Sequence, residues 1–245
     1  MNNRTSKFIY YISIIFILLL IQQITSKIGG LIANLFTYKK LDPQNLFAFI
    51  SVHHIVQGII ALLIIMICKK LYKINFGFKL GKVKEGLNYV GIFTIFMLFY
   101  VLVSYVIFYN LGMIKSLNFS LNAKNVWGTL GFQLLLSGPS EEILFRALPI
   151  SILMLLFNKS IIVKWGVSVE TIIAAFLFSI AHIKWSLSPF VINMDYYQLV
   201  YAFILGVVYG KVYQKSDSVF YPMLMHSISN VLNVGIGYLF AMLIL

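Results

Sequence analysis

The chain has 245 residues, of which 60% are hydrophobic and 11% are charged, and its mean hydropathy is +0.92. Soluble domains are about 45–50% apolar, so this composition excludes an ordinary soluble fold and predicts a protein embedded in a lipid bilayer. The formal net charge of +12 would suit a nucleic-acid-binding protein, but the lysines lie in short loops between apolar runs. Loop lysines of this kind are typical of contact with anionic membrane lipids, so we expect no nucleic-acid partner.

Apolar runs follow one another along the whole chain. A helix needs roughly 20 residues to cross about 30 Å of hydrocarbon. Seven runs approach that length, and they cover residues 8–25, 46–68, 87–109, 126–157, 167–188, 195–213 and 220–244. The long fourth run could be two pieces. We therefore predict an all-α fold, a polytopic transmembrane helical bundle of about seven to eight spans, in which residues 1–245 form a single membrane-embedded domain.

The loop lysines and arginines also predict the orientation of the chain. They are more numerous in the loops on the side of the N-terminus, where the connection between the second and third runs alone holds six lysines. Since loops rich in lysine and arginine stay in the cytoplasm, we expect a multi-pass protein of the cell membrane with a cytoplasmic N-terminus. The first run has the charge pattern of a secretory signal, but no small-residue cleavage site follows it, so we expect it to remain as the first span.

Three charged residues lie inside the fourth apolar run, in the segment Ser137–Arg146. A charged group in the middle of a bilayer costs about 2.5–3.5 kcal/mol on insertion scales, so an intramembrane carboxylate indicates a functional site. Gly138 and Pro139 precede the charges and should interrupt the helix. Ser140 is a good N-cap residue, so we expect a new helix to begin there.

Spacing distinguishes the two adjacent carboxylates of this segment. Glu142 and Arg146 are four residues apart on one helix face, so we expect them to form an ion pair. Glu141 points about 100° away around the helix, which leaves it without a local partner and makes it the better candidate for a general base. The alternative is a buried ion network that only fixes helix packing.

Two later runs each contain a histidine in an apolar setting. His182 follows Phe178 by one helical turn, and His226 precedes Asn230 by the same spacing. We extend the fifth helix toward Pro189, because His182 then lies closer to the middle of the membrane. Each histidine alone could be a hydrogen-bonded packing residue. A glutamate, two histidines and an asparagine on three helices can instead activate a water and stabilise an oxyanion, or hold a divalent metal.

Three further polar or reactive residues lie in the second run. His53 and His54 could face the same cavity, although a packing or hydrogen-bonding role is the simpler interpretation. Cys68 is the only cysteine, so it forms no disulfide within the chain and belongs to no metal motif.

The ordered motifs Glu141-Glu142-x-x-x-Arg146, Phe178-x-x-x-His182 and His226-x-x-x-Asn230 resemble those of the CPBP intramembrane endopeptidases. This family contains CAAX-processing and bacteriocin-processing proteases and is related to the type II CAAX prenyl endopeptidase. The resemblance covers residues 137–233, whereas the first 120 residues match only in being helical and apolar. It implies a hydrolase, an intramembrane endopeptidase that cleaves a peptide bond in a peptide or protein presented at or in the membrane.

The resemblance also implies a role for each motif residue. Glu141 would activate the hydrolytic water, and His182 would help to hold it. The oxyanion would be stabilised by His226 and Asn230, and the site-supporting residues would be Glu142, Arg146 and Phe178. Some family members are described as metal-independent glutamate proteases and others as metalloproteases. The possible metal ligands here are Glu141, His182 and His226, so the expected cofactor is either none or a divalent metal such as Zn.

The expected partners are the lipid bilayer and a peptide or protein substrate, which we expect to reach the site from the cytoplasmic side. The family suggests prenylated C-termini, bacteriocin precursors or peptide pheromones as substrates. Richness in Ile, Lys, Asn and Tyr is typical of an A/T-rich bacterial genome, and this disfavours a prenylated substrate. The alternative function is a non-enzymatic membrane immunity or scaffold protein that retains the motifs for packing. A transporter is a further alternative, although no inverted repeat is visible.

Overall fold

The computed structural model describes residues 3–114, 117–158, 160–187 and 189–243. The helices are α1 (Asn3–Ala33), α2 (Ala48–Tyr72), α3 (Val83–Asn110), α4 (Ala123–Phe132), α5 (Gly138–Glu142), α6 (Leu148–Leu156), α7 (Val169–Ile180), α8 (Tyr196–Ser216) and α9 (Phe220–Met242). Two short antiparallel hairpins pair β1 (Ile162–Lys164) with β2 (Val167–Ser168) and β3 (Lys184–Leu187) with β4 (Phe190–Asn193). The predicted all-α bundle is confirmed.

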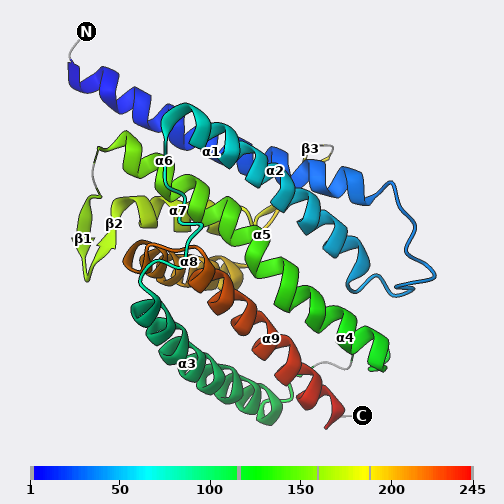
Figure 1. The fold of residues 1–245 in the computed structure, drawn as a ribbon. Coiled ribbons are helices and arrows are strands. Elements are labelled where there is room, and N and C mark those ends of the chain that lie inside the picture. The colour runs from blue at the N-terminus through cyan, green and yellow to red at the C-terminus, as the bar shows by residue number, and fades with distance from the viewer. Residues whose placement is uncertain (1–2, 115–116, 159, 188, 244–245) are drawn as a thin grey trace.

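The bundle is organised around the continuous helical stretch from α4 to α6. Figure 1 shows α1 and α2 along one side of this stretch and α3 and α9 along the other. Helix α2 contacts the stretch and α1 packs on α2, while α9 contacts the stretch and α3 packs on α9. Helices α7 and α8 pack against each other. Helix α5 contacts both α2 and α9, so it is the segment at which both sides of the bundle meet.

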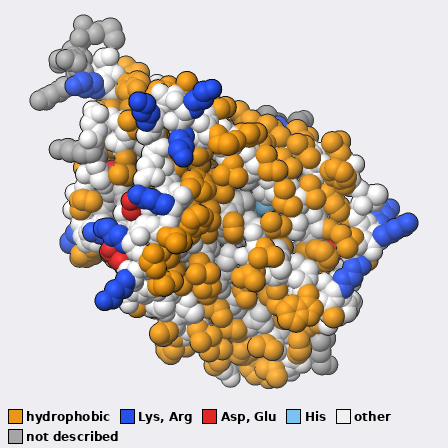
Figure 2. Space-filling view, in the orientation of Figure 1, with side chains coloured by type: hydrophobic (Ala, Val, Ile, Leu, Met, Phe, Trp, Pro, Cys, Tyr) orange, Lys and Arg blue, Asp and Glu red, His pale blue; other side chains and the backbone are white. Residues whose placement is uncertain are grey.

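Within the described part of the chain, three helices are long and apolar enough to cross a membrane, and they cover Thr5–Ala33, Ala48–Tyr72 and Val83–Asn110. Figure 2 shows hydrophobic side chains over the middle of one face of the molecule, with Lys and Arg side chains toward its ends. This distribution suits a molecule whose middle lies in hydrocarbon and whose ends reach the lipid headgroups. The count of seven to eight spans stays a prediction.

Two pairs of connections between helices are in contact at the ends of the bundle. The Lys82 amide donates to the Ser216 carbonyl at 2.8 Å, and Lys79 forms an ion pair with Asp217, so the α2–α3 connection lies against the α8–α9 turn. At another position, the Lys124 ammonium donates to the Lys40 carbonyl at 3.1 Å. The assignment of these loops to the two sides of a membrane, and the cytoplasmic identity of either side, stay predictions.

The fifth apolar run does not form the long helix that we expected. Helix α7 ends at Ile180, and residues 184–187 pair with residues 190–193 from Lys184 opposite Asn193 to Leu187 opposite Phe190. The backbone polar groups of this stretch are thus satisfied by a hairpin rather than by a helix. With 12 residues, α7 is about 18 Å long, which is less than the hydrocarbon thickness, and His182 follows its end in a turn.

The expected helix break at Gly138 and Pro139 is wrong. The chain stays helical from α4 to α6, but it contains two π-helical turns, η1 (Gln133–Ser137) and η2 (Ile143–Ala147). Proline lacks an amide and crowds the carbonyl four residues earlier. A π turn immediately before Pro139 replaces the regular helical hydrogen-bond pattern there, so the helix continues. Ser140 is therefore inside a helix rather than at its N-cap, and its hydroxyl donates to the Ser137 carbonyl at 3.2 Å.

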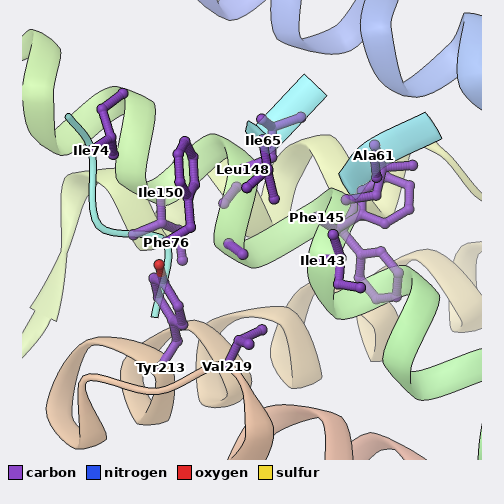
Figure 3. Packing of buried hydrophobic residues seen from close by; sticks show 14 of the residues in the cluster. Ala61, Ile65, Ile74, Phe76, Ile143, Phe145, Leu148, Ile150, Tyr213 and Val219 are labelled. Carbon is purple, nitrogen blue, oxygen red and sulfur yellow. The ribbon is translucent and has the colours of Figure 1, made fainter. Parts of the chain in front are cut away.

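Two packing features hold the central helix in place. Figure 3 shows a buried apolar cluster built mainly from α2, η2, α6, α8 and their connections, with Ala61, Ile65, Ile74, Phe76, Ile143, Phe145, Leu148, Ile150, Tyr213 and Val219. On the side of α9, Gly138 lies directly against Met223 and Ser227. A Cβ atom at Gly138 would lie 2.6 Å from Ser227 Oγ and 2.9 Å from the Met223 carbonyl oxygen, so only glycine permits α5 to approach α9 this closely.

Asp42 fixes the start of α2 from the loop that precedes it. Its carboxylate accepts hydrogen bonds from the amides of Leu46 at 2.9 Å, Phe47 at 2.7 Å and Ala48 at 2.7 Å. Burial by itself raises the pKa of Asp42, but the three amides, helped by the charge of Lys124, hold that pKa below its ordinary value of 3.8. The ionised form of Asp42 therefore stabilises the folded protein.

We expect Asp42→Asn to lower the free energy of unfolding by about 1–2 kcal/mol at neutral pH, as loss of a helix cap does. Because the pKa of Asp42 is lower in the folded than in the unfolded protein, this stabilisation is complete above the unfolded value. It is lost as the pH falls through the folded value. The melting-temperature difference between wild type and Asp42→Asn, measured in detergent, should shrink below a pH of about 4. A difference that does not vary with pH would contradict this account.

Candidate active site

The predicted ion pair between Glu142 and Arg146 is confirmed. Arg146 Nη1 lies 3.2 Å from Glu142 Oε1, and both side chains are 0% exposed. The guanidinium carbon of Arg146 also lies 4.0 Å from the ring centroid of Phe178 and 5.4 Å from that of Tyr209. A carboxylate and two aromatic faces thus compensate the buried positive charge.

Glu142 also sets the orientation of His226. The Nδ1 atom of His226 lies 2.8 Å from Glu142 Oε1. An ionised carboxylate can only accept, so Nδ1 carries the proton of this hydrogen bond. The opposite nitrogen, Nε2, then faces Glu141, whose Oε2 atom lies 3.8 Å away. A buried carboxylate behind a histidine fixes its tautomer and its ring orientation, as it does at many reactive sites.

Glu141 differs from its neighbour in both exposure and contacts. Its side chain is 18% exposed, and a histidine nitrogen faces each of its oxygens: His54 Nε2 lies 3.8 Å from Oε1, and His226 Nε2 lies 3.8 Å from Oε2. The predicted difference between the two glutamates therefore corresponds to a difference in structure. Glu142 belongs to the closed ion network, whereas Glu141 is open to a small molecule.

His182 and Asn230 are each held by one hydrogen bond. His182 Nδ1 donates to the Phe178 carbonyl at 2.9 Å, and the two rings meet edge to face at 4.8 Å. Asn230 Nδ2 donates to Ser137 Oγ at 3.0 Å. An amide nitrogen carries two protons, so Asn230 keeps one N–H that can donate to a ligand. A neutral imidazole has one acceptor nitrogen, so His182 keeps Nε2 to accept from a ligand.

Two cavities meet at Phe178 and His182. The larger has a volume of about 420 Å³, and its lining includes Tyr100, Tyr201, His226 and Asn230. The smaller has a volume of about 140 Å³, and its lining includes Gln22, His54, Gln57 and Glu141. The site is therefore two-sided, with Glu141 lining the small polar cavity and His226 and Asn230 lining the larger aromatic one.

His54 is the residue of this site that the sequence interpretation missed, since packing was the simpler explanation for it. Its Nδ1 atom lies 2.7 Å from Ser140 Oγ. The only signal in the sequence was a polar residue within an apolar run. Its position beside Glu141 depends on the packing of α2 against α5, where a Cβ atom on Gly58 would lie 3.4 Å from Ser140 Cβ, and such a long-range contact leaves no spacing pattern.

Metal binding was the alternative for Glu141, His182 and His226. Over residues 3–114, 117–158, 160–187 and 189–243, no group of three or more His, Cys, Asp and Glu side chains is arranged to hold a metal ion. His182 and His226 each have Nδ1 within hydrogen-bonding distance of a protein oxygen. This leaves Nε2 of each ring for a water or a metal, so the choice between a metal-independent and a metal-dependent site stays a prediction.

Comparison with known proteins gives a match to a family model. No curated protein and no solved structure matches the chain. A family model described as type II CAAX prenyl endopeptidase Rce1-like matches residues 123–232. The matched segment begins with α4, ends within α9 and contains all three motifs, whereas His54 lies outside it. Residues 123–232 are therefore similar to the Rce1-like domain of the CAAX protease family, a similarity that suggests a CAAX-type membrane protease.

Proposed function

We propose that this protein is an intramembrane endopeptidase in which Glu141 activates the water that hydrolyses the peptide bond. The observation that carries the proposal is the position of Glu141. Its carboxylate faces a polar cavity with a histidine nitrogen 3.8 Å from each oxygen, while the adjacent Glu142 is consumed by a buried ion pair. A carboxylate held open in this way is suited to accept a proton from water.

The reaction needs only groups that line the two cavities. Glu141 takes one proton from the water, whose oxygen forms a bond to the carbonyl carbon of the substrate. His182 uses its Nδ1 proton on the Phe178 carbonyl, so its Nε2 remains as an acceptor that can help to hold the water in place through a neighbouring water. When the C–N bond breaks, Glu141 returns its proton to the leaving amine, so that the enzyme ends in its starting state.

The negative charge on the substrate oxygen requires donors on the opposite side. Asn230 offers the amide proton that Ser137 does not use. His226 can donate from Nε2 when it is an imidazolium, and that extra positive charge would balance the second carboxylate of the cluster. Two such donors in a partly enclosed site stabilise a tetrahedral oxyanion. We place the scissile carbonyl in the larger cavity, because both donors line it.

The proposed substrate is a peptide or protein presented at or in the membrane, without a required prenyl group. We keep the multi-pass arrangement and the approach from the cytoplasm as parts of this proposal. The lysine-rich connection between α2 and α3 is their main support, because loops of this composition remain cytoplasmic.

The test is cleavage of a peptide library by the purified protein in liposomes, with products identified by mass spectrometry. We expect cleavage by the wild type and its loss in His226→Ala. Addition of a metal chelator should leave the rate unchanged. Loss of activity on chelation, with recovery on adding Zn, would instead support the metal-dependent form of the reaction. A cellular phenotype retained by Glu141→Ala would support an immunity or scaffold function.

A further inference from the structure

We propose that His54, a residue of α2 outside the Rce1-like segment, holds the hydrolytic water against Glu141. The inference rests on the proposed function and adds to it a site residue that the three motifs do not contain. It is carried by the hydrogen bonds of His54, by the direction of its Nε2 atom and by the cavity that this atom faces.

The protonation of the His54 ring follows from its partner. The Ser137 carbonyl oxygen can only accept, so we assign to it the proton of the Ser140 hydroxyl, 3.2 Å away. In this assignment Ser140 Oγ accepts from His54 Nδ1 at 2.7 Å, and both hydrogen bonds form together. With its proton on Nδ1, a neutral His54 has a lone pair on Nε2, and this lone pair is directed to the side of Glu141.

Two acceptors then face each other across the cavity. His54 Nε2 and Glu141 Oε1 are 3.8 Å apart, and neither a neutral Nε2 nor a carboxylate oxygen supplies a proton to the other. A water molecule has two protons and can donate one to each acceptor at normal hydrogen-bond lengths. This arrangement orients the lone pairs of the water away from both groups, and thus leaves them available for attack on a carbonyl carbon.

The cavity beside these two acceptors is suited to water. Its volume of about 140 Å³ is lined by polar groups that include Gln22, Ser26 and Gln57. A water molecule occupies about 30 Å³ of liquid volume and needs two to four polar partners, so this cavity has room for several waters. Among the hydrogen bonds of the described residues, that of His54 uses Nδ1, which leaves Nε2 for a water of this cavity.

A pair of substitutions separates water binding from packing. In His54→Asn, the short amide lies near the former Nδ1 position and keeps the contact with Ser140, but nothing replaces Nε2. In His54→Gln, the longer amide reaches the former Nε2 position. We expect His54→Asn to lower kcat by about 10- to 100-fold, with KM changed by less than about twofold, because the cavity assigned to the peptide does not include His54 among its lining residues. We expect His54→Gln to recover a substantial part of kcat.

His53→Asn is the comparison for a second histidine of the same cavity: His53 Nε2 lies 3.2 Å from Gln57 Oε1 on its own helix, so we expect a smaller loss of kcat than in His54→Asn. Melting temperatures in detergent report whether each variant folds. Wild-type kcat in His54→Asn would overturn the proposal, and so would an equal loss in His54→Asn and His54→Gln. A wild-type chain that cleaves no peptide, or cleavage unaffected by Glu141→Gln, removes the proposed function itself and this inference with it.

Discussion

Glu141→Gln should lower the rate of peptide cleavage by about 10²- to 10⁴-fold, the range that general-base catalysis contributes. Glutamine has the shape of glutamate but cannot take a proton from water. The substitution should leave the fold intact, because the Glu141 side chain is 18% exposed and its histidine contacts are at 3.8 Å. The packing of this region depends instead on the fully buried pair of Glu142 and Arg146. The measurement is kcat on a cleaved peptide, together with the melting temperature of each variant.

A matched substitution at an exposed glutamate controls for the change in charge. Glu85 lies in the first turn of α3 and is 3.7 Å from Lys82 on the surface. We expect Glu85→Gln to retain wild-type kcat and to melt within a few degrees of wild type, since exposed ion pairs contribute about 0–1 kcal/mol. Undiminished cleavage by Glu141→Gln would remove Glu141 from the mechanism.

Arg146→Met should lower the free energy of unfolding by about 3–5 kcal/mol, as removal of one partner from a buried ion pair does. Methionine preserves much of the apolar contact but leaves the Glu142 carboxylate, which is 0% exposed, without its guanidinium. The stacking of Arg146 on the Phe178 ring at 4.0 Å is lost as well. Reversible unfolding in mixed detergent micelles gives the free energy directly.

The double variant Glu142→Gln with Arg146→Met separates the effect of a buried charge on stability from its effect on catalytic activity. Removing both charges should recover part of the stability lost in Arg146→Met, because no uncompensated ion then remains in the interior. Activity should not return, since His226 loses the charged group that accepts from Nδ1 at 2.8 Å. A double variant that is less stable than Arg146→Met would contradict this account, because it would show that the Glu142 carboxylate stabilises the fold even without its guanidinium.

Local spacing predicted part of the fold well. The helices around Glu142 and Arg146, and their pairing across one turn, follow from side chains four residues apart. Two predictions were wrong because the backbone polar groups formed hydrogen bonds in a way that the sequence pattern does not indicate. Pro139 did not end its helix, because a π turn comes before it, and Lys184–Leu187 did not continue α7, because it pairs with Phe190–Asn193. Neither outcome has a clear periodic signal in the sequence.

The sequence predicted those residues of the candidate site that belong to a spacing motif. His226 and Asn230 share a helix face by spacing, and both line one cavity. The contribution of α2 was not predictable, because the contact of His54 with Ser140 joins residues 86 positions apart. Likewise, Gly138 gave no indication in the sequence that α5 packs directly against the backbone of α9. Contacts between helices of this kind appear only when the bundle is assembled.

The most direct test of the central claim is a single-turnover cleavage in water enriched in ¹⁸O, followed by mass spectrometry of both product and enzyme. If Glu141 activates a water, the first turnover should place one ¹⁸O atom in the new carboxyl group of the N-terminal product fragment and none in the Glu141 side chain. Label in Glu141, or an unlabelled product after the first turnover, would contradict the account, because it would show that the carboxylate itself attacks the substrate.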